Sequence, residues 1–118
     1  MQDQDAVDLL KAIREHSGLE LSTIRGVCGP GHGADAGYGG FTYYSDTSEF
    51  YESNRELLWR ILSEDAEEFG FDNVPAFVAS FNNASMANTE EGFECLVSWY
   101  ALEQMSFWLQ MRREEAAS

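Results

Sequence analysis

The 118-residue sequence has few cysteines, few positive charges and no long apolar run. Two cysteines, Cys28 and Cys95, are too few for a disulfide scaffold, so we expect free thiols in a reducing compartment. No apolar run approaches the roughly 20 residues that span a bilayer. Residues 1–8 contain three Asp and no Lys or Arg, which is the wrong charge for a signal peptide. These features predict a soluble, cytoplasmic protein without a membrane partner.

The charge balance is strongly acidic. Seven Lys plus Arg oppose 21 Asp plus Glu, which gives a formal net charge of −14. This balance excludes a sequence-independent nucleic-acid binder, because such proteins use Lys and Arg to replace the counterions of phosphates. With 44% hydrophobic and 14% aromatic residues, the chain is too apolar for a disordered acidic tail. We expect one acidic helical domain over residues 1–118.

Apolar periodicity predicts an all-α fold of about four helices. The first two are expected over residues 5–16 and 48–69, and each is followed by a glycine, Gly18 and Gly70. Residues 45–48 are good N-cap types before the second helix. The third helix should start at the cap Asn73, with Pro75 in its first turn, and end at Asn82 and Asn83.

The fourth helix is expected to run from Asn88 or Thr89 to about Arg113, with Asn88 and Glu91 resembling a capping box. Residues 19–25 fit neither a helical nor a strand period, so a small two-stranded element near residues 20–44 remains open. Seven of the fifteen residues from 26 to 40 are glycine, which predicts one long loop without regular structure.

The second helix carries the most informative pattern, a row of carboxylates. Between residues 46 and 72, nine acids accompany only two arginines. On a straight helix, five of the acids fall within one narrow stripe opposite the apolar side: Glu49, Glu52, Glu56, Glu64 and Glu67. Such a stripe either keeps the protein soluble or meets a basic surface, because residues three and four apart have Cβ atoms about 5–6 Å from one another and their carboxylates can stand in for phosphates.

Two polar residues, Asn54 and Asp65, lie in the middle of the apolar side of the same helix. A buried carboxylate without donors would cost several kcal/mol, so Asp65 should have hydrogen-bond donors nearby. The backbone N–H groups of the glycine-rich loop are one possible source.

Chemistry-bearing motifs are weak. The segment Gly29-Pro30-Gly31-His32-Gly33 lacks the Lys and Ser or Thr of a phosphate-binding loop. Cys28 and His32 lack the further Cys or His ligands of a zinc site. We therefore expect no catalytic residue, metal or cofactor and no enzymatic activity. The alternative is a small enzyme or ligand-binding domain that uses the glycine-rich loop with Cys28, His32 and Asp65.

The last helix is apolar around more than half of its circumference, and its two apolar faces include Trp99, Tyr100, Met105, Trp108 and Met111. It is either the central helix of the domain or half of an interface, since Trp, Tyr and Met are frequent at interfaces. A homodimeric regulatory or structural protein that pairs through this helix is therefore a second alternative.

Three segments carry a resemblance to known proteins: GFTYYSDTSEFYESNRELLWRILSEDAEE (40–68), VASFNNA (78–84) and SWYALEQ (98–104). They resemble a family of short acidic bacteriophage proteins of unassigned function, which offers no catalytic residues to carry over. The resemblance implies a phage or mobile-element origin, where small acidic all-α proteins often inhibit host defence, as anti-CRISPR proteins do. It therefore favours an inhibitor in the host bacterial cell. Its acidic stripe would bind a basic nucleic-acid-binding surface of a defence complex such as a CRISPR effector, and so block nucleic-acid access.

Overall fold

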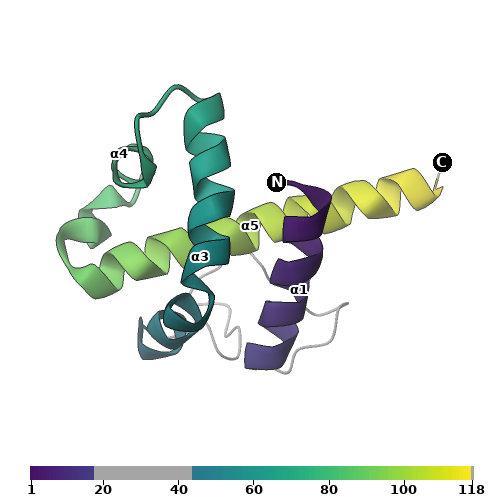
Figure 1. Ribbon diagram of the computed structural model, residues 1–118, viewed down its shortest axis with the longest axis horizontal. Coiled ribbons are helices and arrows are strands. Elements are labelled where there is room, and N and C mark those ends of the chain that lie inside the picture. Colours follow the sequence, from purple (N-terminus) through teal and green to yellow (C-terminus); the bar gives the residue numbers. More distant parts are fainter. Residues whose placement is uncertain (18–43, 118) are drawn as a thin grey trace.

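The computed structural model describes residues 1–17 and 44–117 (Figure 1). The described elements are α1 (Asp3–Ser17), α3 (Tyr44–Glu68), α4 (Val74–Val78), the short 3₁₀ helix η2 (Ala84–Asn88) and α5 (Glu90–Ala117). The predicted all-α fold is confirmed. The glycine-rich loop 26–40, residues 19–25 and the two-stranded element expected near residues 20–44 lie outside the described residues.

Helix α5 is the central element. In Figure 1 it runs across the width of the molecule, with α3 and α1 crossing it and α4 beside the far end of α3. The largest set of helix–helix contacts joins α3 to α5, and α5 also contacts α1, α4 and η2. Fully buried side chains from three helices fill the core between them, among them Leu9, Ile13, Phe50, Leu58, Ile61, Leu62, Leu102 and Met105. The central-helix interpretation therefore holds for most of α5.

The end of α3 and the start of α4 follow the local signals of the sequence. Gly70 adopts a φ of +84°, which favours glycine, and the Phe71 N–H donates to the Ala66 carbonyl at 2.8 Å. This hydrogen bond and the left-handed conformation of Gly70 close the helix in a Schellman motif. Asn73 then caps α4, because its side chain accepts a hydrogen bond from the Ala76 N–H at 2.8 Å.

The beginning of α3 differs from the prediction. Residues 45–48 do not cap the helix but lie inside it, since it begins at Tyr44. Thr47 is fully buried, and its side chain lies against that of Cys95 on α5. This contact with a distant helix supports an extra first turn that no local pattern indicates.

The cap of α5 is Thr89 rather than Asn88, so the expected capping box of Asn88 and Glu91 is wrong. The Thr89 hydroxyl accepts a hydrogen bond from the Gly92 N–H at 3.0 Å. A β-carbon on Gly92 would lie 1.7 Å from the Met86 carbonyl oxygen of η2. Glycine is required here because η2, which the sequence did not predict, packs directly against the first turn of α5.

Candidate functional site

Helix α3 is kinked, and the kink divides the predicted carboxylate stripe. Asn54 has the non-helical angles φ −130° and ψ 22°, and its side-chain amide donates to the Phe50 carbonyl at 3.0 Å. Residues before Asn54 therefore form an arm that points away from the rest of the helix (Figure 1). The expected single row of Glu49, Glu52, Glu56, Glu64 and Glu67 does not form, because a straight-helix wheel does not continue through Asn54.

The first arm of α3 brings two of the predicted residues, Glu49 and Glu52, beside the N-terminus of α5. The two glutamates share an open depression of about 340 Å³ with three glutamates of α5. We call these five residues the acidic cluster: Glu49, Glu52, Glu90, Glu91 and Glu94. None of the five forms an ion pair with another described residue.

The electrostatics of the acidic cluster are visible at Glu94. Burial raises the pKa of this carboxyl above its ordinary value, and the charges of Glu52, Glu90 and Glu91 add to the increase, while the Ser48 hydroxyl acts in the opposite direction. Glu90 and Glu91 lie in the first turn of α5, where the helix dipole favours negative charge. The dipole offsets part of the repulsion, but no described Lys or Arg side chain forms an ion pair with the acidic cluster.

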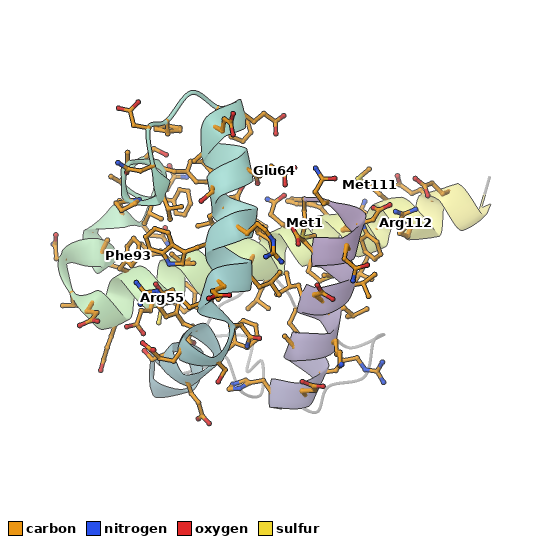
Figure 2. The ribbon with its side chains drawn as sticks, viewed as in Figure 1. Met1, Arg55, Glu64, Phe93, Met111 and Arg112 are labelled. Atoms are coloured by element: carbon orange, nitrogen blue, oxygen red, sulfur yellow. The ribbon has the colours of Figure 1, made fainter. Side chains whose placement is uncertain are left out.

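The other predicted residues lie beyond the kink. Glu56 is exposed on the same helix as Arg60, whose guanidinium binds the buried carboxylate of Asp5 at 2.9 Å. Glu64 faces the start of α1, where it lies 3.8 Å from the N-terminal amine of Met1 and accepts from Gln2 at 3.2 Å (Figure 2). Glu67 is exposed near the end of α3. Only Glu49 and Glu52 therefore join the concentration of negative charge around α5.

Sequence reasoning missed the three α5 members of the acidic cluster. Their acidic character was visible, but at a helix start it is explained by the macrodipole alone. The signal that could have identified them is the run of Glu90, Glu91 and Glu94 without a basic residue near them in sequence. These three glutamates lie close to Glu49 and Glu52 only because of the kink at Asn54, which the sequence did not predict.

Asp65 has a donor, as the sequence required, and the donor is Tyr100 of α5. The carboxylate is buried and accepts a hydrogen bond from the Tyr100 hydroxyl. Burial and then this hydrogen bond raise the pKa of Tyr100 well above its ordinary range, so the tyrosine remains a donor. The sequence suggested the glycine-rich loop as a source of this donor, and the structure shows that Tyr100 supplies one. The hydrogen bond between Tyr100 and Asp65 joins α5 to α3.

Of the three residues considered for enzymatic chemistry, only Asp65 lies within the part of the chain that the structure describes. Cys28 and His32 lie outside the described residues. Cys95 is a free, fully buried thiol whose pKa burial raises to about 11, which is the reverse of an activated nucleophile. Within residues 1–17 and 44–117, no three His, Cys, Asp or Glu side chains are placed to hold a metal ion.

The far end of α5 presents an apolar surface. Phe107 and Met111 are 52% and 58% exposed, in contrast to the largely buried stretch of α5 from Gly92 to Met105. Beside them the Arg112 guanidinium lies 4.8 Å above the Trp108 ring and binds Asp3 of α1 at 2.6 Å (Figure 2). This contact lowers the pKa of Asp3 and attaches α1 to α5, while Phe107 and Met111 are left facing outward.

Fold and site together define a small all-α protein with a strongly acidic surface at the junction of two helices. The chain belongs to the family of a domain of unknown function, DUF7222, whose model matches residues 4–115. No curated protein and no solved structure matches the chain. Among the described helices, none combines the length and the apolarity that a membrane crossing needs.

Proposed function

We propose that this protein is a binding protein and not an enzyme, and that its acidic cluster binds a basic protein surface that normally holds nucleic acid. The observation that carries the proposal is the convergence of Glu49, Glu52, Glu90, Glu91 and Glu94 from two helices without a basic partner among the described residues. By occupying such a surface, the protein would exclude DNA or RNA from it.

The acidic cluster gathers like charges that no ion pair compensates among the described residues. Bringing several carboxylates together costs free energy in the isolated protein, and a cationic surface that binds them recovers this cost. Residues on neighbouring helical turns have Cβ atoms about 5–6 Å apart, so their carboxylates offer Arg and Lys side chains a series of negative charges comparable to phosphates. A solubility role alone gives no reason for five glutamates to gather around one depression.

The target class of this proposal rests on the phage-protein resemblance of residues 39–104. We infer an inhibitor of a bacterial defence system, with the nucleic-acid channel of a CRISPR effector complex as the surface that is blocked. Such an inhibitor acts in the cytoplasm of the host cell, needs no cofactor and makes no direct contact with nucleic acid.

The homodimer alternative is favoured by a different observation, the exposed Phe107 and Met111 at the end of α5. A second copy would cover these side chains and pair the two α5 ends. Sedimentation at about tens of micromolar distinguishes the alternatives, since a monomer at this concentration contradicts the homodimer.

The proposal is tested by capture from a nuclease-treated bacterial lysate on the immobilised protein at about 50 mM salt, where charged surfaces are weakly screened. We expect nucleic-acid-binding proteins to be retained, and to be released both by about 0.5 M salt and by a DNA or RNA oligonucleotide. Retention that resists both salt and oligonucleotide would contradict the proposal.

A further inference from the structure

A second concave site lies on another part of α5, where the chain passes from α4 to η2. This pocket has a volume of about 530 Å³, which is within the range of small-molecule sites. Its lining residues include Phe81, Asn82, Asn83, Tyr100 and Glu103. None of these residues belongs to the acidic cluster.

The apolar part of the pocket consists of fixed aromatic rings. Phe81 and Tyr100 stack with centroids 5.4 Å apart and an interplanar angle of 18°. Phe77 contacts both rings edge-on, at 5.1 Å and 5.2 Å, and is itself buried in the core. Phe81 and Tyr100 are half-buried and line the pocket, so part of each ring is open to a ligand, and an aromatic face attracts cations.

The polar part of the pocket is negative. Glu103 is half-buried and forms no hydrogen bond or ion pair with any other described residue, and the loss of solvent raises its pKa. The charges of Asp65, Glu103 and Glu68 all act on the nearby Tyr100 hydroxyl. No described arginine or lysine pairs with these three carboxylates.

Two amides add acceptors at the rim. The Asn83 side-chain NH₂ donates to the Met86 sulfur at 3.9 Å, which leaves its amide oxygen to accept from a ligand. Asn82 is exposed and contributes a second amide. A ligand that suits the whole lining therefore carries a positively charged hydrogen-bond donor on an apolar stem.

We propose that this pocket binds an organic cation, a guanidinium or ammonium group on a short aliphatic chain, with Glu103 as the counter-charge and the Phe81 and Tyr100 rings against the stem. The proposal is independent of the acidic cluster. The cation is either the Arg or Lys side chain of a protein or a free amine, and the two sources share the same recognition chemistry.

The test is an amide chemical-shift titration of the full chain by NMR with Nα-acetyl-arginine amide, and with the neutral isostere Nα-acetyl-citrulline amide as the matched ligand. We expect saturable shifts at Asn82, Asn83, Tyr100 and Glu103 with the arginine ligand only. Glu103→Gln should weaken binding about tenfold, since a charge-assisted hydrogen bond is lost. Glu67→Gln, an exposed glutamate of α3, should leave binding unchanged.

Equal binding of the citrulline amide, shifts confined to the acidic cluster, or an unaltered affinity of Glu103→Gln would each overturn the proposal. Agmatine and putrescine distinguish the two sources of the cation. Tighter binding of the arginine amide than of either amine indicates a protein side chain, and the opposite order indicates a free amine. A failure of this pocket to bind the arginine ligand would leave the capture of lysate proteins by the acidic cluster unaffected. The two proposals can therefore fail separately.

Discussion

The hydroxyl of Tyr100 donates a hydrogen bond to the carboxylate of Asp65, which joins α5 to α3 beside the apolar core. A buried carboxylate is tolerated in this position because it has a donor that remains protonated. Tyr100 also contacts the Phe77 ring of α4. The pair therefore lies beside the place where α4 packs on α5. The stability of the fold should therefore depend on both members of the pair together.

Removing the donor tests this dependence. Tyr100→Phe leaves the Asp65 carboxylate buried without its partner, and we expect a loss of about 1–3 kcal/mol in the free energy of unfolding, measured with urea. Adding Asp65→Leu should restore part of that loss, because both polar groups are then absent. Strictly additive effects of the two substitutions would show that the residues do not interact.

Gly92 tests the packing of η2 against α5. In an ordinary helix, Gly→Ala stabilises by up to about 1 kcal/mol. Here the new β-carbon would collide with the Met86 carbonyl oxygen, so we expect Gly92→Ala to destabilise by about 1–3 kcal/mol in urea unfolding. The neighbouring exposed position supplies the control, since Glu91→Ala should change stability by no more than about 0.5 kcal/mol. A Gly92→Ala variant as stable as the parent would refute the close approach.

The raised pKa of Glu94 predicts that the stability of the fold depends on pH. The pKa of its carboxyl is raised above its ordinary 4.5 in the folded state, chiefly by burial, so the folded protein holds this proton more tightly than the unfolded chain does. Its contribution to stability is therefore lost as pH rises from about 4.5 through the folded pKa. Glu94→Gln should be more stable than the parent at pH 7 by up to about 0.5 kcal/mol, the size of one like-charge pair with Glu90.

The advantage of Glu94→Gln should shrink as the pH falls through the folded pKa and should be smallest well below the ordinary value of 4.5, where both states of the parent are protonated. Thermal unfolding of the two proteins across this range gives the difference directly. Glu67→Gln, on an exposed part of α3, should show a small difference at pH 7. If Glu94→Gln were less stable than the parent at pH 7, the repulsion in the acidic cluster would be refuted.

Elements with local causes could be predicted from the sequence. The stop at Gly70 and the cap at Asn73 depend on the conformational freedom of one residue and the side-chain oxygen of another. The start of α3 could not be predicted, because Thr47 is buried by a helix about fifty residues away. The need for glycine at position 92 likewise arises from η2, which has no strong sequence signal.

The candidate site was predictable only in part. Glu49 and Glu52 followed from helical spacing, but their grouping with Glu64 and Glu67 assumed a straight helix. Asn54 was recognised as a polar residue at an apolar position, yet the kink it marks became evident only in the structure. Because the kink turns the first arm toward α5, the acidic cluster combines residues that no sequence spacing connects.

We propose that the acidic cluster, and not negative charge in general, binds the partner. Glu49→Lys with Glu52→Lys places four units of charge change inside the cluster. The matched control, Glu15→Lys with Asp72→Lys, makes the same change at two exposed positions outside it. Both double variants should keep the fold, because exposed substitutions usually change stability by no more than about 0.5 kcal/mol each.

The most direct measurement is the affinity of these two double variants and the parent for a protein captured from the lysate, at the same salt concentration. Each repulsive contact at a charged interface costs several kcal/mol, so we expect the Glu49→Lys, Glu52→Lys protein to bind at least about a hundredfold more weakly than the parent. The Glu15→Lys, Asp72→Lys control should bind within about threefold of the parent, since distant exposed charges are screened. Equal losses in the two variants, or no loss in either, would contradict the claim that the acidic cluster is the binding surface.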